Sequence, residues 1–247
     1  MDVLTDLNTA FELEERQPQI AFLPVGATEQ HSRHLPLATD TLLGDRLSAD
    51  VIARVARPGA VYLLRTLPFS SSAENMGFRG TVNFTPLTMR GILRDTYESL
   101  ARAGIRQLVV CPWHGGNFIL KPVVRELNHE LGRCAVIYLN PWEHVPANVY
   151  ARFAPGFEVH CGDVETSLML ALWPDTVRAD RRDNPVPFQA IWQDMFSMKT
   201  LSGGEGHAGH PTRATDDKGR EFAEAVVTHA ARYLTTILTM ADRFTQY

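Results

Sequence analysis

The sequence has few cysteines, and they are not arranged in pairs. Cys111, Cys134 and Cys161 make an odd number, and no two of them have a CxxC spacing. A disulfide framework is therefore not expected. Cys134 lies in an apolar run, which favours a buried core thiol. Cys111 and Cys161 lie near histidines but lack a local nucleophile signature, so two thiols lining a pocket wall explain them as well as a Cys/His nucleophile does.

Long apolar runs and basic runs are also missing. No segment approaches the roughly 18 unbroken apolar residues that a membrane span requires. The first residues lack the basic and apolar regions of a signal peptide. The formal net charge is -4 and the isoelectric point is near 6.1, so neither nucleic acid nor an anionic membrane is an expected partner. We expect a cytoplasmic protein.

The sequence does contain enough apolar residues for one large domain. With 247 residues, 45% of them hydrophobic, the chain fits a single domain over 1–247. Short apolar runs predict buried strands at 20–25, 61–69, 108–113 and 134–139. Apolar residues at helical spacing predict helices over 41–55, 86–103, 118–131, 163–173 and 219–242. This alternation predicts an α/β fold, a three-layer αβα sandwich with a mostly parallel central sheet.

The segment 175–215 does not follow this alternation. It shows no steady period, and its glycines between 203 and 209 predict a mobile loop. His207 and His210 would then either form a lid over a site or simply face solvent.

The first stretch that points to chemistry follows the predicted strand 20–25. Its loop carries Glu29 and His31, two positions apart, and Asp40 comes directly before a predicted helix. If the loop stays extended, Glu29 and His31 project the same way. Carboxylate oxygens combined with imidazole nitrogen suit Zn²⁺, Mn²⁺ or Fe²⁺ better than Ca²⁺ or Mg²⁺. The alternative is that Asp40 is only a helix N-cap and the other two are ordinary loop residues.

The second stretch is Pro112-Trp-His-Gly-Gly-Asn-Phe118, at the end of another predicted strand. In a parallel sheet, ligands gather outside the carboxyl ends of the strands, so His114 would lie near Glu29 and His31. The His-Gly-Gly-Asn sequence also fits an anion cradle of backbone N–H groups at a helix N-terminus. Asn117 would contact substrate in either case.

The third stretch is His160-Cys-Gly-Asp-Val-Glu-Thr-Ser-Leu-Met169. Asp163 fits an N-cap of the following helix. Glu165, however, precedes a segment apolar enough to be buried, and a buried carboxylate needs a cation or strong hydrogen bonds. A metal ion would supply that cation.

Together these stretches resemble the signature blocks of the creatininase family of metal-dependent amidohydrolases. The matching segments are Leu23-Pro-Val-Gly-Ala-Thr-Glu-Gln-His31 with Asp40, His114-Gly-Gly-Asn117, His160-x-Gly-x-x-Glu165-Thr-Ser and Gly209-His-Pro-Thr-Arg-Ala-Thr215 with Lys218-Gly-Arg. They occur in order over roughly residues 15 to 235.

The resemblance implies a dinuclear metal site. Glu29 and His114 would hold one divalent ion, His31 the other, and Asp40 would bridge the two. His160 corresponds to a family residue placed for proton transfer. Creatininases proper have a glutamate for the second metal at the position that is Gly116 here. Glu165 is the expected replacement, with Asp163 as the alternative.

The implied activity is hydrolysis of a C–N bond in a small cyclic amide or a formamide, by a metal-bridging hydroxide. The cofactors would be two divalent ions per chain, zinc, manganese or iron. Ser72, Glu74, Asn117 and Trp142 are candidate substrate contacts, and the family suggests a homo-oligomer, commonly a hexamer. The alternatives are hydrolysis of a lactone or a ring carbon–carbon bond by the same site, or a non-catalytic small-molecule or metal-binding protein of the same fold.

Overall fold

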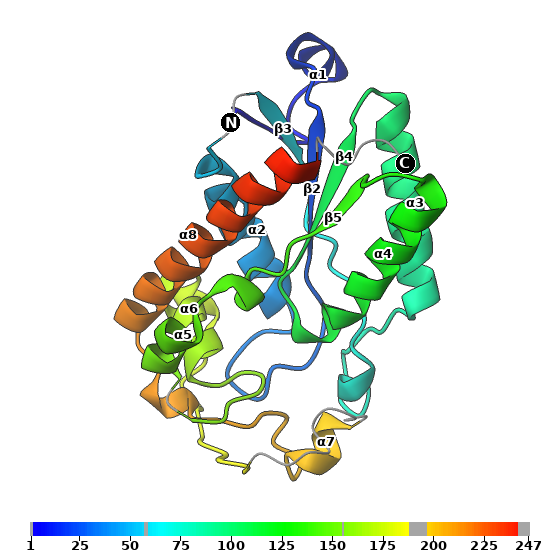
Figure 1. Cartoon of the computed structure of the whole chain (residues 1–247). Coiled ribbons are helices and arrows are strands. Elements are labelled where there is room, and N and C mark those ends of the chain that lie inside the picture. The colour runs from blue at the N-terminus through cyan, green and yellow to red at the C-terminus, as the bar shows by residue number, and fades with distance from the viewer. Residues whose placement is uncertain (1, 57–58, 155, 188–196, 242–247) are drawn as a thin grey trace.

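The computed structural model describes residues 2–56, 59–154, 156–187 and 197–241. Its centre is a parallel sheet of five strands in the order β1-β3-β2-β4-β5 (Figure 1). The strands are β1 (Asp2–Leu4), β2 (Ile20–Val25), β3 (Ala60–Leu63), β4 (Gln107–Pro112) and β5 (Val136–Tyr138). The central pair, β2 and β4, is buried along its whole length. Both faces of the sheet must therefore be covered, as is usual for parallel strands.

Helices connect the strands and follow them. The α-helices are α1 (Ala10–Arg16), α2 (Thr39–Ala53), α3 (Pro86–Arg102), α4 (Leu120–Leu131), α5 (Ala147–Phe153), α6 (Asp163–Leu172), α7 (Met198–Leu201) and α8 (Asp216–Ala241). The short 3-10 helices are η1 (Ala73–Asn75), η2 (Gly115–Ile119), η3 (Trp142–His144), η4 (Pro174–Thr176) and η6 (Pro211–Arg213). Among the described residues, no helix is both long and apolar enough to cross a bilayer.

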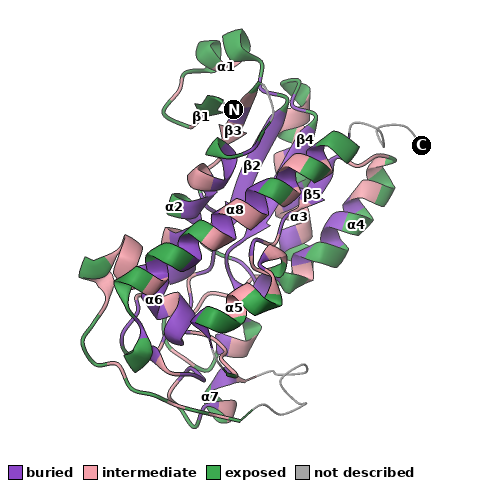
Figure 2. Ribbon diagram, turned by 60° about the vertical axis from the view of Figure 1, so that its left-hand side comes forward, coloured by how far each residue is buried: buried purple, intermediate pink, exposed green. Residues whose placement is uncertain are grey.

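The two faces of the sheet pack against different helices. Along β2, Ile20 and Phe22 belong to the apolar cluster formed with α2, α6 and α8, whereas Ala21 and Leu23 belong to the cluster formed with α3 and α4. Successive side chains of a strand point to opposite faces, so one strand supplies both cores. Figures 1 and 2 show the sheet between these two helical layers, with their outer surfaces exposed. The predicted three-layer αβα sandwich is confirmed.

Local sequence signals explain several element boundaries. The prediction of a strand at 20–25 is confirmed, and β4 ends at Pro112 as expected from the missing N–H of proline. The helix α3 starts at Pro86, and the hydroxyl of Thr85 accepts the backbone N–H of Thr88 as an N-cap.

Other boundaries differ from the predictions. The strand predicted over 61–69 ends at Leu63, and the last helix begins at Asp216 instead of Gly219. The elements β1 and α1 were not predicted. The helix α1 buries none of its residues, and Phe11 is 80% exposed, so it lacks the apolar face on which the pattern search depends.

The two acids that fit a helix N-cap do not cap. The N-cap of α2 is Ala38, and Asp40 is the second residue of the helix. The N-cap of α6 is Gly162, and Asp163 is its first residue. The capping interpretation of both aspartates is therefore wrong, and their carboxylates have other partners.

Candidate functional site

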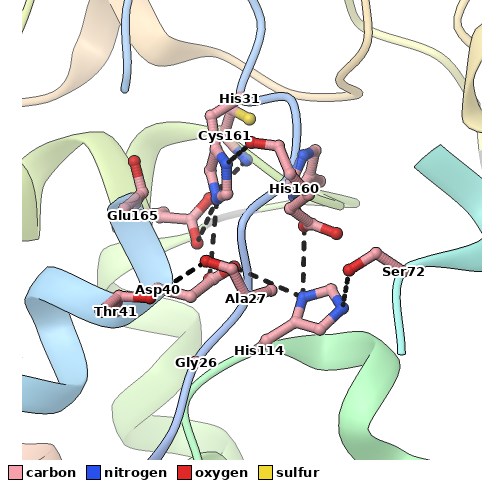
Figure 3. A network of polar contacts seen from close by, with 12 residues as sticks. Gly26, Ala27, His31, Asp40, Thr41, Ser72, His114, His160, Cys161 and Glu165 are labelled. Carbon is pink, nitrogen blue, oxygen red and sulfur yellow. Dashed lines mark hydrogen bonds and ion pairs between the residues drawn. The ribbon is translucent and has the colours of Figure 1, made fainter. Parts of the chain in front are cut away.

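The candidate site lies at the carboxyl edge of the sheet. Val25 and Pro112 are paired in register at the ends of β2 and β4, so the segments that follow them start side by side. The first carries Glu29 and the second carries His114. The first turn of α2 brings Asp40 close to His114 (Figure 3). This edge is where ligands of parallel sheets usually bind.

Asp40 lies between two histidines. Its Oδ1 is 3.6 Å from His31 Nε2, and its Oδ2 is 3.6 Å from His114 Nδ1. His114 Nδ1 is also 3.2 Å from Glu29 Oε1. Each oxygen of Asp40 therefore faces a different imidazole, as expected for a carboxylate shared by two cations.

Residues from the segment before and within α6 complete the cluster on the His31 side. Glu165 Oε1 is 3.8 Å from His31 Nε2, and Glu165 Oε2 accepts the backbone N–H of Cys161 at 2.7 Å. The ring of His160 lies 4.4 Å from that of His31, and His160 Nδ1 is 3.4 Å from Glu29 Oε1. Of the two replacement ligands expected from the sequence, Glu165 faces the cluster.

Asp163, the alternative replacement, points elsewhere. Its Oδ2 accepts from Lys218 Nζ at 2.6 Å, and its Oδ1 accepts from Ser167 Oγ at 3.2 Å. This ion pair joins α6 to the start of α8, so Asp163 is a structural carboxylate here.

Each histidine of the cluster is oriented by a backbone carbonyl on the side away from the carboxylates. The ring nitrogen and carbonyl pairs are His31 Nδ1 with Glu29 at 3.0 Å, His114 Nε2 with Ser71 at 2.7 Å and His160 Nε2 with Gln30 at 2.6 Å. A carbonyl only accepts, so each of these nitrogens carries a proton and donates it. When such a ring is neutral, its opposite nitrogen presents a lone pair to the centre, as in metal-binding histidines with outer partners.

Several atoms at the centre are buried and unpaired. Within the described residues, Glu29 Oε1, His31 Nε2 and Asp40 Oδ2 have no hydrogen-bond partner. Burying such atoms without a partner is costly, so native proteins rarely leave them unsatisfied. Carboxylate oxygen and imidazole nitrogen together are ligands for zinc, manganese or iron. The residues present therefore fit a bound divalent metal ion.

The close approach of carboxylates and imidazoles also shifts the pKa values of these side chains. Burial alone would lower the pKa of His114, but the carboxylates of Glu29 and Asp40 raise it to about 10. Burial likewise opposes protonation of His31, whose pKa is nevertheless held well above its usual range by Asp40 and Glu165. Burial raises the pKa of Glu29, yet His114 and His160 lower it overall. Protons on the imidazoles therefore balance the carboxylates, and a divalent cation would displace them.

A cavity of about 740 Å³ opens onto this centre. Glu29, Asp40, His114 and Glu165 line its inner end, and His160 contributes to its wall. Two of the predicted substrate contacts, Glu74 and Trp142, also line this cavity.

The other two predicted substrate contacts lie behind the cavity wall. Asn117 is fully buried, and its Nδ2 donates to the carbonyls of Val25 and Gly26 at 3.2 Å each. It therefore ties the end of β2 to η2. Ser72 is fully buried too, and its Oγ lies 3.5 Å from His114 Nε2, which places it beside a cluster histidine.

For His207 and His210 of the glycine-rich loop, the sequence left two alternatives, a lid over the site or solvent exposure. His207 is buried, and its Nε2 contacts the carbonyl of Arg182 at 2.9 Å. His210 pairs with Asp183 at 3.1 Å. Both side chains are thus held within the fold, and residues 188–196 of the predicted loop lie outside the described residues.

Two polar residues at the site were not predicted. Asn75 Nδ2 donates to Glu29 Oε2 at 2.9 Å, which fixes one side of that carboxylate. Glu158 accepts the backbone N–H groups of Asp163 and Val164 at 2.5 and 3.0 Å, and burial raises its pKa to about 7. Asn75 ends the three-residue helix η1 and Glu158 lies outside helices and strands, so no periodic pattern marks either as a buried side chain.

Comparison with known proteins identifies relatives of this chain. The family model described as creatininase, creatinine amidohydrolase, matches residues 7–234. A creatinine amidohydrolase of Pseudomonas putida is 34% identical over 224 residues, which are 84% of this chain and 85% of that protein. A mycofactocin precursor peptide peptidase of Mycolicibacterium smegmatis is 32% identical over 226 residues, 89% of this chain and 85% of that protein. A solved structure of a manganese creatininase superposes with a TM-score of 0.78 at 27% identity, covering 94% of this chain and 98% of that one.

Proposed function

The chain belongs to the creatininase family, and from this premise we propose that it cleaves the C–N bond of a small cyclic amide, a formamide or a short peptide amide. Its family relatives are hydrolases, and its own buried carboxylates and histidines form candidate metal-binding groups. The observation that carries the proposal is the position of Asp40, whose two oxygens face His31 and His114 separately.

Five residues would hold the cations. Glu29 and His114 would bind one, His31 and Glu165 the other, and Asp40 would bridge them. When bound, two such cations lower the pKa of a water from about 15.7 to about 7 and polarise the carbonyl to be attacked. The protein's part is to aim these ligands at one point, through the backbone carbonyls behind the imidazoles.

His160 would supply the proton that the departing nitrogen needs. Its Nε2 donates to the carbonyl of Gln30 at 2.6 Å, which fixes the ring with Nδ1 turned toward Glu29. The residue lines the cavity, so substrate can reach it. Imidazole titrates near neutrality, which suits a general acid.

Peptide amides are included among the proposed substrates because of the cavity volume and the substrates for which two relatives are named. A volume of about 740 Å³ lies within the roughly 300–1,000 Å³ of sites that hold drug-sized ligands. It is more than a single small ring needs. One relative is named for creatinine and another for a precursor peptide, so both substrate sizes occur among proteins similar to this chain.

The proposal is tested by measuring metal content and hydrolysis together. Purified protein loaded with zinc or manganese is screened against lactams, imides, formamides and short peptides, with and without chelator. We expect turnover that chelator abolishes. His160→Gln should lower kcat by about 100-fold or more, because general acid catalysis contributes roughly 10²–10⁴-fold. His129→Gln, on the exposed surface of α4, should leave kcat unchanged.

Three results would contradict the proposal. Turnover that survives complete metal removal would exclude metal-dependent hydrolysis. Turnover only of lactones or ring ketones would contradict cleavage of a C–N bond, although the same residues would form the active site. Tight ligand binding without turnover of any of these compounds would favour a non-catalytic binding protein. A homo-oligomer is a further part of the proposal, and light scattering on the eluting protein measures it.

A further inference from the structure

Gly116 and the carboxylate of Glu74 are close neighbours beside His114. A Cβ atom added at Gly116 would lie 2.6 Å from the Ser71 carbonyl oxygen and 2.7 Å from Glu74 Oε1. Both distances are shorter than van der Waals contact allows, so a glutamate does not fit at position 116 in this backbone. The carboxylate of Glu74, a residue of η1, occupies space that any side chain at position 116 would need.

The carboxylate of Glu74 is free to accept a hydrogen bond. It lines the cavity and is 18% exposed, with Oε1 3.8 Å from His114 Nε2. That nitrogen already donates to the Ser71 carbonyl at 2.7 Å, so its proton is engaged elsewhere. In the part of the chain that the structure describes, no donor makes a hydrogen bond to Glu74. An N–H group of a bound molecule is the partner that this geometry leaves open.

The charges around the cavity favour a positive partner. Its described lining contains no lysine or arginine, and its five carboxylates belong to Glu29, Asp40, Glu74, Glu158 and Glu165. Two divalent cations would bring four positive charges against these five carboxylates, so one negative charge would remain. Glu158 is already held by two backbone amides of α6. Glu74 accepts no hydrogen bond from the described residues, and its ion-pair contact is with His114 Nε2 at 3.8 Å.

The positions of Glu74 and His160 indicate how a substrate would be oriented in the cavity. His160 lies beside His31, whereas Glu74 lies beside His114. If the departing nitrogen is protonated by His160, as in the proposed function on which this inference rests, the acyl part of the substrate extends toward Glu74.

We propose that Glu74 is a specificity-determining residue that binds a protonated nitrogen on the acyl side of the scissile amide. The substrates would therefore be amides whose acyl group carries an ammonium or amidinium group. Trp142 and the ring of Phe118, on other parts of the cavity wall, supply apolar surface for the rest of the molecule. A charge-assisted hydrogen bond is about twice as strong as a neutral one, so this contact discriminates against uncharged analogues.

Three matched compounds test the proposal on the metal-loaded, full-length protein. Glycine 4-nitroanilide carries an ammonium group, propionic acid 4-nitroanilide replaces it with a methyl group, and malonic acid mono-4-nitroanilide carries a carboxylate. We expect kcat/KM for the glycine compound to exceed that for the propionyl compound by about 10-fold or more, since hydrogen bonds to charged groups contribute roughly 1.5–3 kcal/mol. The malonyl compound should be the poorest. Glu74→Gln should remove these preferences, and Glu126→Gln, exposed on α4, should keep them.

Binding measurements separate this inference from the proposed function. Calorimetry with glycinamide and propionamide needs no turnover, and the wild-type protein should bind glycinamide more tightly while Glu74→Gln binds both alike. That binding preference without hydrolysis would support the role of Glu74 and contradict the amidohydrolase. Hydrolysis with equal kcat/KM for all three anilides would contradict the role of Glu74 and support the amidohydrolase. Loss of a metal ion from Glu74→Gln would also overturn the inference, because Glu74 would then be a ligand.

Discussion

The two halves of the proposed metal centre are built on different kinds of backbone. On one side, Glu29, Asp40 and His114 come from the segments that follow β2 and β4 and from the first turn of α2. On the other side, His31 is joined by His160 and Glu165, from a segment that leads into α6. His160 has a φ of 60°, a left-handed conformation that non-glycine residues rarely adopt.

The comparison indicates what holds each half in place. The first half depends on the sheet, because β2 and β4 are hydrogen-bonded in register up to Val25 and Pro112. The second half depends on where α6 packs against α8. Gly219 of α8 lies so close to the Ser167 carbonyl that no side chain fits at position 219, and Lys218 pairs with Asp163 nearby. The sheet thus positions one half directly, whereas in the other half helix packing brings Glu165 to His31, which itself follows β2.

The change that should break both halves at once is Asp40→Asn. Asp40 is the carboxylate that faces both His31 and His114, so losing its charge weakens both cation sites. Outer partners of metal ligands already contribute about 10–100-fold to affinity or activity, so loss of the shared ligand should cost at least about 100-fold in activity. Elemental analysis should find fewer than one ion per chain. Retention of two ions would show that the halves do not share this residue.

Glu165→Gln should remove the cation of the second half and leave that of the first. Because Glu165 faces His31 and lies on the α6 side, its loss should leave one ion per chain, held by Glu29, Asp40 and His114. Asp163→Asn is the matched control, since that carboxylate bonds to Lys218 and Ser167 away from the centre, and it should retain two ions. Two ions in the Glu165 variant would remove its assignment as a ligand.

The smallest expected effect, about tenfold per pH unit, is the pH dependence of metal loading in the first half. The neighbouring carboxylates raise the pKa of His114 to about 10 in the metal-free chain, so at neutral pH a cation must displace a proton from it. The apparent affinity should therefore rise with pH by about tenfold per unit for each proton displaced, and level off near pH 10. Calorimetry in buffers of different ionisation enthalpy measures the released protons. Loading that releases none would mean that His114 is neutral before the cation binds.

Much of the first half was predictable from local patterns. The apolar runs 20–25 and 108–113 predict two strands, and the rule for parallel sheets then brings Glu29 and His114 together. The position of Asp40 required more than this pattern, since its place before a helix also fitted an N-cap. The structure shows that Ala38 takes that position, because the helix begins one residue before Asp40.

The second half was predictable mainly through family resemblance. Glu165 and Asp163 were both candidates, because they lie two positions apart before the same apolar helix. The choice between them depends on Lys218, 55 positions further along the chain, which draws Asp163 away. Glu158 and Asn75 had no local signal at all. Each acquires its role only from partners brought together by folding.

The sequence by itself determined the alternation of strands and helices, the burial of both sheet faces and the histidines and carboxylates available at the strand ends, because these depend on side-chain periodicity and on residue chemistry. The tertiary structure decided which of those groups converge. Only the packing of α6 on α8 turns Glu165 toward His31 and Asp163 toward Lys218, and only the approach of η1 to Gly116 places Glu74 beside His114. Such contacts join residues far apart in the chain, and a one-dimensional pattern does not contain their distances.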